Sequence, residues 1–562
     1  MSRGMLWALA CALTAIILGG CERSAGAGAK ADDEPLSANP IVVFATAGDR
    51  NTVIPLPGAI DEPVRLVNAP RSIRLKDGEL IVSHAVPVHE KAIVRRESSG
   101  ETRIVWNATQ PVDGPAYPLK ISDSGRWLVD ANGKPFQGNG EAIWTVFAQL
   151  DRQNVAFYFR DRSRKGVDLA VGRMIEHRFS NNDPVSANAF GETPFSARIG
   201  WGAFLGTGSE DFTTPNERYW RHVDWILREA YRYGIVFIVF PAYVGYGHDE
   251  AGWTEEMRAN GPARMRAYGE FLGRRYASYP NIIWALGGDW GPVAGNSDVT
   301  AEVNALAEGI RSQDPVHLMT AKSERNRSSV DDYDQPWLDI NAVYTWPTNT
   351  AEQFRRNRIK APDMPAFLIE GYYGNEHGID GFDIRRQIWQ ALLYGGFAHI
   401  YGNSPTWYFG RDSRASANYF ADVKGLEWRY VLNRLGAQYL KYVAVLQAVR
   451  DFSKLEPDFE RQVVPNEHVW AASNAEQLIA YVGAGTDKVA VNTAQFAAGR
   501  YFVNWYSPAT GALVRRGSRS LVSREVTLEA PSRDDWILLL DNAELKAPEP
   551  GFPFAGEGVG DR

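Results

Sequence analysis

The chain has 562 residues, of which 44% are hydrophobic, so it is long enough to bury a large core and to form more than one domain. Its net charge of −7 and isoelectric point near 5.8 indicate no basic surface of the kind that binds nucleic acid, and we expect no nucleic-acid partner. Aromatic residues make up 12% of the chain and include 18 tryptophans. Core packing explains most of them, but flat aromatic faces also stack on sugar rings, so the composition favours a carbohydrate ligand.

Residues 1–20 have the pattern of a secretory signal peptide. Arg3 precedes an apolar run from Met5 to Leu18, which is too short to span a bilayer. The run ends in Leu-Gly-Gly before Cys21, and this resembles the bacterial lipobox, in which the cysteine is lipidated and becomes the new N-terminus. An ordinary secretory signal that is cut nearby is the alternative. We expect a lipid anchor on Cys21 that holds the protein at a membrane of the bacterial cell envelope, facing the periplasm or the outer surface.

The second cysteine, Cys11, lies in the same segment, so the mature chain would contain no free thiol. This argues against cysteine nucleophiles, disulfides and thiolate metal sites. The nine histidines show no His-Glu-x-x-His spacing, which argues against zinc. We expect no metal and no cofactor.

Residues 21–38 are small and polar and are predicted to form a flexible tether. Residues 39–115 contain short β-like runs separated by turn residues, which predicts a small all-β domain. Nothing in this domain carries recognisable chemistry, so structural packing is its expected role. The runs are Ile41–Phe44, Val64–Val67, Leu80–Val82, Ala92–Val94 and Thr102–Trp106.

Residues 116–457 alternate between strand-like and helix-like patterns. Eight strands separated by helices predict an α/β fold of the (β/α)8 type, a TIM barrel. A doubly wound sheet is the alternative, but it would need a glycine-rich phosphate turn, and we find none. The expected strands are Phe136–Trp144, Val167–Met174, Ile235–Tyr243, Ile282–Trp290, His317–Lys322, Leu338–Trp346, Ala366–Tyr373 and Ala398–Trp407.

One of the helices between these strands is marked clearly, from Pro215 to Tyr233. Thr214 and Glu217 form a T-x-x-E capping box, and Gly234 follows the last turn. Further helices are predicted at 151–165, 262–278, 300–312 and 383–394.

Residues 458–546 return to a β pattern and are predicted to form a C-terminal β-sandwich domain, joined to the barrel by a helical stretch at 423–448 and followed by a flexible tail, 547–562. The expected strands are Val469–Ala472, Leu478–Val482, Lys488–Val491, Tyr501–Trp505, Glu525–Leu528 and Trp536–Leu540.

Two acids follow buried-type strands of the predicted barrel. Asp289 ends the fourth strand, after Gly287 and Gly288, and Glu370 ends the seventh. The carboxyl ends of barrel strands form the catalytic face, and glycoside hydrolysis needs two carboxylates on either side of the scissile bond. A structural salt bridge would explain either acid alone. Both acids at the ends of two strands favour catalysis.

Other candidates lie at the same end of the predicted strands. Glu141 and Arg173 could bind sugar hydroxyls or a uronate carboxylate, or could pair with each other as a salt bridge on the rim. Tyr344 could contact the nucleophile or pack in the core. The candidate aromatic residues for sugar subsites are Trp144, Trp290, Trp346 and Trp407.

The barrel region resembles the apiosidase-like catalytic domain, the group that contains glycoside hydrolase family 140. The runs that carry the resemblance are Leu128–Phe136, Arg162–Gly166, Pro280–Asp289, Ile369–Gly371 and Tyr401–Trp407. The resemblance implies a retaining mechanism, with Asp289 as the acid/base and Glu370 as the nucleophile. Retention would place the two carboxyl groups about 5–5.5 Å apart.

Two further points qualify this resemblance. The runs Asn504–Gly511 and Asp534–Asp541 resemble the β domain that often follows such barrels and is labelled collagen-binding, although packing against the barrel is the role we expect here. Glu141 stands where the family has an aspartate, and Trp290 follows Asp289 in place of a polar residue. The substrate of the family therefore need not be the substrate of this chain.

The sequence thus favours a retaining glycoside hydrolase that acts on a complex polysaccharide or oligosaccharide. An inverting hydrolase is the close variant, and the distance between the carboxylates would decide between them. A non-catalytic glycan-binding lipoprotein with a degenerate barrel is the alternative from another class. A polysaccharide lyase would need a base beside a cation site, and we find no such cluster.

Overall fold

The computed structural model describes residues 114–550, except for 201–202, 204–207, 246–251, 290–297, 347–348, 410–426 and 522–523, together with six strands between residues 52 and 108. Several predictions lie outside these residues: the signal peptide, the tether, Cys21, the strand at Ile41–Phe44, Trp290 and most of the tail. By contacts the chain divides into two units, residues 1–109 and 110–562. In the described part of the chain, no helix combines the length and the apolar character needed to cross a membrane.

The six described strands of the N-terminal unit form two three-stranded sheets. One has the order β1-β4-β3 with antiparallel pairs, and in the other β6 pairs in parallel with β2 and antiparallel with β5. Strands β2, β4, β5 and β6 lie at four of the runs expected from the sequence. The bounds are β1 (Thr52–Pro55), β2 (Val64–Val67), β3 (Ile73–Lys76), β4 (Glu79–Val82), β5 (Glu90–Arg96) and β6 (Thr102–Ala108).

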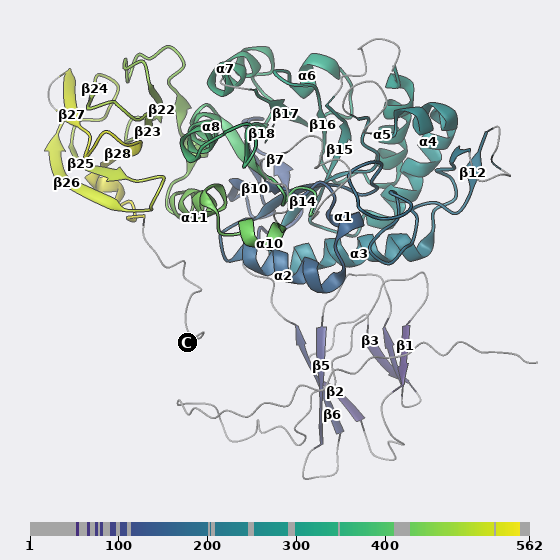
Figure 1. Cartoon of the computed structure of the whole chain (residues 1–562). Coiled ribbons are helices and arrows are strands. Elements are labelled where there is room, and N and C mark those ends of the chain that lie inside the picture. The colour runs from purple at the N-terminus through teal and green to yellow at the C-terminus, as the bar shows by residue number, and fades with distance from the viewer. Residues whose placement is uncertain are drawn as a thin grey trace, which may run out of the picture. The chain divides into compact units, whose positions relative to one another are not determined.

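The second unit is built on the predicted (β/α)8 barrel, which the structure confirms (Figure 1). Eight parallel strands follow one another around the sheet, and the first pairs with the last to close it. Nearly every residue of these strands is buried, as expected for strands covered by helices. The strands are β10 (Gly138–Ala142), β11 (Leu169–Arg173), β14 (Val236–Phe240), β15 (Ile282–Gly287), β16 (Met319–Lys322), β17 (Ile340–Tyr344), β18 (Ala366–Glu370) and β20 (Gly396–Asn403).

Helices surround the barrel, and short strands lie at its margins. The helices are α1 (Val146–Gln149), α2 (Arg152–Ser163), α3 (Glu217–Arg232), α4 (Thr254–Tyr276), α5 (Thr300–Gln313), α6 (Ser329–Asp332), α7 (Thr350–Lys360), α8 (Gly381–Leu393), α10 (Trp428–Val431) and α11 (Leu435–Gln447), followed by the 3-10 turn η4 (Phe452–Lys454). The short strands are β7 (Lys120–Ile121), β8 (Leu128–Val129), β9 (Pro135–Phe136), β12 (Arg198–Ile199), β13 (Ser209–Glu210) and β19 (Tyr373–Gly374).

The predicted capping box of α3 is wrong. The N-cap is Asn216, whose side chain accepts a hydrogen bond from the backbone N–H of Arg218. Thr214 is engaged elsewhere: its hydroxyl donates to the carbonyl of Asp211 at 2.9 Å and accepts from the N–H of Ala197 at 3.1 Å. These contacts keep the backbone before Asn216 non-helical, so the helix begins at Glu217.

The C-terminal domain is all β, as predicted. A six-stranded sheet has the order β21-β22-β23-β28-β25-β26, and β24 pairs with β27 in a second sheet. The bounds are β21 (Glu456–Pro457), β22 (Val469–Ser473), β23 (Gln477–Val482), β24 (Lys488–Asn492), β25 (Arg500–Tyr506), β26 (Leu513–Ser520), β27 (Glu525–Glu529) and β28 (Trp536–Asn542), with the 3-10 turn η5 (Ala543–Leu545).

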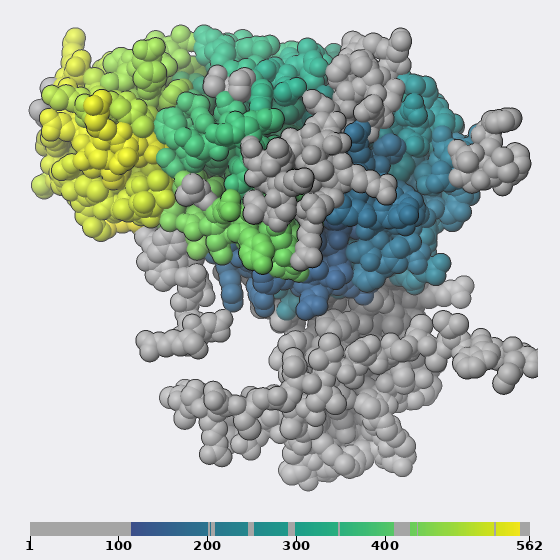
Figure 2. Space-filling model, viewed as in Figure 1, coloured from purple at the N-terminus to yellow at the C-terminus, as the bar shows by residue number. Residues whose placement is uncertain are grey.

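The C-terminal domain shares a core with the barrel, and Figure 2 shows the two in direct contact. One continuous hydrophobic cluster includes residues of β23 and β28 as well as of α8 and the barrel strands. Within this contact, Arg385 of α8 forms a two-point ion pair with Asp535, with both N–O distances at 2.7 Å. The hydroxyl of Tyr481 donates to the same carboxylate at 2.9 Å. The domain is therefore attached rigidly through α8.

Replacing Arg385 with alanine is expected to lower the free energy of unfolding by about 3 kcal/mol, because it leaves the buried Asp535 carboxylate without its cation. Urea unfolding followed by tryptophan fluorescence measures the loss. The matched control is Arg355→Ala, which removes an exposed ion pair with Glu460 and is expected to leave the unfolding midpoint unchanged. Equal effects of the two substitutions would contradict the assignment.

Candidate active site

The two acids singled out in the sequence lie at the carboxyl end of the barrel. Asp289 lies two residues beyond β15, and Glu370 is the last residue of β18. Their side chains are 17% and 13% exposed, although the strands that carry them are buried. The two carboxylates can therefore meet a ligand while the barrel fixes their positions.

A lysine that the sequence analysis did not single out joins these acids. The ammonium of Lys322, at the end of β16, contacts Oδ1 of Asp289 and lies 3.0 Å from Oε2 of Glu370. Its side chain is fully buried. Lys322 ends the fifth strand as the two acids end theirs, so a search for any charged residue at strand ends would have found it.

The environment of Lys322 is partly aromatic and partly cationic. Its ammonium lies 4.0 Å from the ring centroid of Tyr344 on β17, which is a favourable cation–π distance. Burial lowers the pKa of Lys322 to about 8, the negative charge of Glu370 acts in the opposite direction, and Arg173 and Arg325 lower the pKa further. Tyr344, which was expected to lie near Glu370 or in the core, thus packs against the cation between the two acids.

Arg173, at the end of β11, is enclosed by aromatic rings. Its guanidinium carbon lies 4.1 Å from the ring centroid of Tyr243, 5.2 Å from that of Phe179 and 5.4 Å from that of Trp144. Its ion pair is with Glu176, at 3.4 Å. The side chain is nearly buried, so water screens its charge little and the charge acts on the groups around it.

Trp144 extends the site through a tyrosine. Its indole N–H donates to the hydroxyl of Tyr373 at 2.6 Å. Tyr373 is buried, and both burial and the negative charge of Glu370 raise its pKa. Tyr373 ends the seventh strand expected from the sequence, Ala366–Tyr373, but was not among the candidate site residues.

The prediction for Glu141 is wrong. The carboxylate is 1% exposed and pairs with Arg162 of α2 rather than with Arg173. Burial raises the pKa of Glu141, and the charge of Arg162 opposes the rise. The pairing shows that Glu141 faces the helix layer outside the barrel, so it cannot reach a ligand bound beside Asp289 and Glu370.

The two described tryptophans beyond strands six and eight differ in accessibility. Trp346 is half-buried and packs edge-on against Tyr372, with ring centroids 5.1 Å apart. Trp407 is nearly buried, and its indole N–H donates to Glu376 at 3.0 Å. Trp346 can therefore offer a face to a sugar, whereas Trp407 is held in the wall of the site.

Glu376 is a third acid near the pair. It accepts hydrogen bonds from the Ser404 hydroxyl and the Trp407 indole. Burial raises its pKa to about 7, and the nearby charge of Glu370 adds to the rise. Glu376 lies in the loop after β19, so it does not end any of the strands predicted from the sequence.

The two glycines before Asp289 allow the backbone bend that positions this residue. Gly287 has φ of +78°, and a Cβ there would overlap the Tyr333 hydroxyl and the Lys322 carbonyl oxygen. The N–H of Gly288 donates to the carbonyl of Lys322 at 3.1 Å. Lys322 thus holds the Asp289 segment by its backbone as well as by its ammonium.

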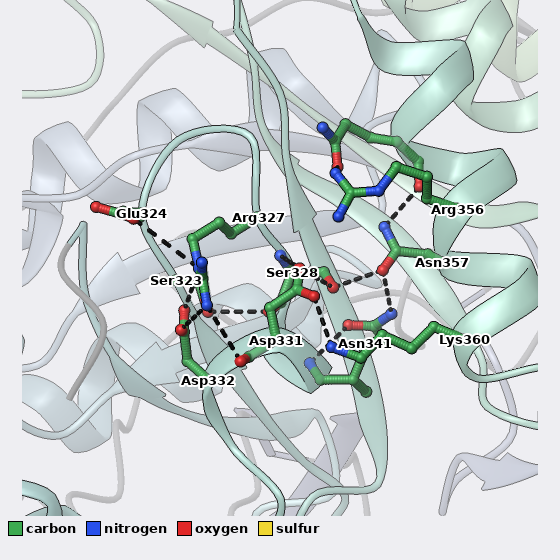
Figure 3. Close-up of polar contacts among 12 residues, drawn as sticks. Ser323, Glu324, Arg327, Ser328, Asp331, Asp332, Asn341, Arg356, Asn357 and Lys360 are labelled. Carbon is green, nitrogen blue, oxygen red and sulfur yellow. Dashed lines mark hydrogen bonds and ion pairs between the residues drawn. The ribbon is translucent and has the colours of Figure 1, made fainter. Parts of the chain in front are cut away.

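The segment that follows Lys322 is fixed by a polar network between α6, β17 and α7 (Figure 3). The Ser323 hydroxyl donates to the Ser328 carbonyl at 3.1 Å, and the Ser328 hydroxyl donates to Oδ1 of Asn357. The same oxygen accepts from Nδ2 of Asn341 at 3.2 Å. Two ion pairs complete the network, Arg327 with Asp332 and Lys360 with Asp331, the latter at 2.7 Å. Among the described residues, no group of three or more His, Cys, Asp or Glu side chains is arranged to hold a metal ion.

Alanine at Gly287 is expected to destabilise the protein more than alanine at Gly133. Both glycines have positive φ, +78° and +81°, so both substitutions cost about 1–2 kcal/mol of backbone strain. Only Gly287 adds an overlap, because a Cβ at Gly133 meets nothing within 4 Å. Urea unfolding of the two variants measures the difference, and equal losses would show that the bend after β15 tolerates a side chain.

Substituting Glu376 with glutamine is expected to change how stability depends on pH. The pKa of about 7 in the folded protein lies above the ordinary 4.5, so the stability that this group contributes is complete below pH 4.5 and is lost as the pH rises through 7. The difference in unfolding free energy, wild type minus variant, should therefore fall by up to roughly 3 kcal/mol over that range. The exposed Glu352→Gln is the control, and a flat difference for Glu376→Gln would contradict the shift.

Comparison with known families matches residues 122–454 to the family described as "Apiosidase-like, catalytic domain". Residues 459–541 match "Putative collagen-binding domain of a collagenase". No curated protein matches the chain.

Solved structures share the fold. A glycoside hydrolase family 5 protein from Bacteroides vulgatus ATCC 8482 has a TM-score of 0.65 and 22% identity, over 77% of this chain and 95% of that one. A structure described as "Glycoside hydrolase" has a TM-score of 0.63 and 22% identity, over 76% of this chain and 97% of that one. The family match covers more than half of the chain and agrees with the barrel and its strand-end acids. The chain therefore belongs to the apiosidase-like family, and its barrel is the catalytic domain of a glycosidase.

Proposed function

We propose that the protein is a retaining glycoside hydrolase in which Asp289 is the acid/base and Glu370 is the nucleophile. The observation that carries the proposal is the contact of one ammonium group, Lys322, with both carboxylates. A single nitrogen can touch both acids only if they lie close together. This supports the separation of about 5–5.5 Å typical of retaining enzymes over the roughly 6.5–9.5 Å that leaves room for water in inverting enzymes.

The reaction would proceed in two steps. In the first, protonated Asp289 gives its proton to the glycosidic oxygen, the bond from that oxygen to the anomeric carbon breaks, and Glu370 forms an ester with that carbon. In the second, Asp289 takes a proton from water, whose oxygen attacks the anomeric carbon and releases Glu370 as a carboxylate. The sugar leaves with its original anomeric configuration.

The surroundings of the pair support a complex polysaccharide or oligosaccharide as substrate. Trp346 remains partly accessible beyond β17, and the guanidinium carbon of Arg325 lies 6.0 Å from the centroid of its ring. An aromatic face beside an exposed cation suits a sugar ring that carries hydroxyl or acidic groups. Trp144, Arg173 and Tyr344 are assigned to the inner wall of the same subsite, and Trp290 remains a candidate from the sequence.

The cell location forms part of the proposal. The lipobox-like run before Cys21 supports a lipid anchor in the bacterial cell envelope. Such an anchor would keep the enzyme at a membrane surface, where it meets glycan from outside the cytoplasm.

The catalytic assignment predicts that Glu370→Gln and Asp289→Asn each lower hydrolysis of a natural glycan by on the order of 10³-fold, since each removes a reacting group. Release of reducing sugar from a panel of plant, algal and bacterial polysaccharides measures the loss, and Glu352→Gln is the control. On an aryl glycoside with an activated leaving group, azide should restore part of the activity of Asp289→Asn, because azide attacks the glycosyl-enzyme without help from a base.

Two outcomes would overturn the proposal. Wild-type rates in both acid variants would remove the catalytic pair and favour a glycan-binding protein with a degenerate barrel. If proton NMR of the first sugar released shows the opposite anomer, the enzyme inverts.

A further inference from the structure

Lys322 occupies an unusual place for a fully buried cation. Its ammonium lies between two carboxylates that the proposed mechanism requires in opposite protonation states. Burying an ammonium group is costly unless partners compensate for the lost hydration. Here the partners are the two acids to which the proposed mechanism assigns the reaction, so the charge of the lysine acts directly on both of them.

The groups that face Lys322 come from every neighbouring part of the barrel. The acids are Asp289, after β15, and Glu370, on β18. The aromatic rings are Tyr344 on β17, at 4.0 Å, and Tyr243 after β14, at 6.0 Å. The cations are Arg173 on β11 and Arg325 after β16, and both act against the charge of Lys322. Two carboxyl groups therefore face the ammonium at contact distance, while the other cations act from farther away.

The backbone keeps Lys322 in this position. Its carbonyl accepts from the N–H of Gly288, and β16 pairs with β15 in register from Trp284–Met319 to Gly287–Lys322. The chain beyond Lys322 is held by the network of Figure 3, in which Ser328 of the following segment bonds to Asn357 of α7. Neither side of the lysine is free to move it away from the acids.

We propose that Lys322 is the shared counter-ion of the catalytic pair, a positioning residue that holds the two carboxylates at the retaining distance and stays beside their single negative charge throughout the reaction. The proposal rests on the function proposed above. Before the first step the charge is on Glu370. When Glu370 becomes an uncharged ester and Asp289 has lost its proton, the charge is on Asp289. The ammonium contacts both positions, so it stabilises each state and the net charge of the three groups does not change.

Lys322 should therefore place the pH range of activity lower than the two acids would have without the ammonium. The active form carries one proton on the two acids. Without the ammonium, two carboxylates would face each other directly, and like charges at this distance resist being ionised together. Removing the cation should therefore shift both limbs of the kcat/KM profile to higher pH.

The test compares Lys322→Met and Lys322→Gln with the wild type in kcat/KM against pH, on an activated aryl glycoside that the wild type hydrolyses. Lys322→Gln serves if the methionine variant fails to fold, because an amide can still hydrogen-bond to both acids. We expect kcat/KM at the optimum to fall at least tenfold and both limbs to rise by one pH unit or more. Lys322→Arg retains a cation and should keep the limbs within a few tenths of a unit of the wild type.

The matched control is Lys165→Met. Lys165 is also a buried lysine, but it pairs with Asp161 at 2.6 Å on the α2 side of the barrel. Its loss should lower stability without moving either limb. If the Lys322 variants lose activity with unmoved limbs, the lysine is merely structural and the proposal is wrong. Full activity in Glu370→Gln, run in parallel, would instead overturn the proposed function and the counter-ion role with it.

Discussion

The contact of one buried ammonium with two carboxylates is the constraint around which the catalytic end of the barrel is arranged. Coulomb attraction brings Asp289 and Glu370 together, although they stand on the fourth and seventh strands and would repel each other if both were ionised. The surrounding features follow from the need to keep Lys322 buried and fixed. Tyr344 covers its ammonium, Gly287 allows the bend that brings Asp289 to it, and the network beyond β16 holds the segment that follows.

Support for Glu370 extends into the C-terminal domain. Gln387 of α8 accepts from the N–H of Tyr372 at 2.6 Å and donates to the carbonyl of the same residue at 3.0 Å, which fixes the chain two residues beyond Glu370. The same helix carries Arg385, whose buried ion pair reaches Asp535. A continuous path of hydrogen bonds and packed side chains therefore runs from the β domain to the chain just beyond β18, the strand that ends in Glu370. This domain matches a family named for collagen binding. Its contacts in the structure are with the barrel, which it supports through a shared hydrophobic core.

Strand-end reasoning located much of the site because parallel strands of a barrel all point their carboxyl ends to one face. It placed Asp289, Glu370, Arg173 and Tyr344 at that face. It did not find Lys322, since a lysine at a strand end is usually solvated, nor Tyr373 on the short strand β19, nor Glu376 in the loop after that strand. It misplaced Glu141, because successive side chains of a strand point to opposite faces. A shift of one residue therefore decides whether a side chain points toward the ligand or toward the surrounding helices. The capping box at Thr214 was also wrong, because its hydroxyl bonds to Asp211 and Ala197 instead of to the start of the helix.

The sequence by itself determined the alternation of buried strands and amphipathic helices, and hence the barrel, the all-β C-terminal domain and the two acids at strand ends. These depend on periodicity and local hydrophobicity, which any stretch of chain displays on its own. The tertiary structure alone decided which charges meet. Asp289, Lys322 and Glu370 are separated by dozens of residues, and their contact arises only when β15, β16 and β18 close into one barrel. The partner of a buried charge is set by three-dimensional packing. An unpaired buried ion is strongly destabilising, and only an opposite charge that the fold brings near can offset that penalty.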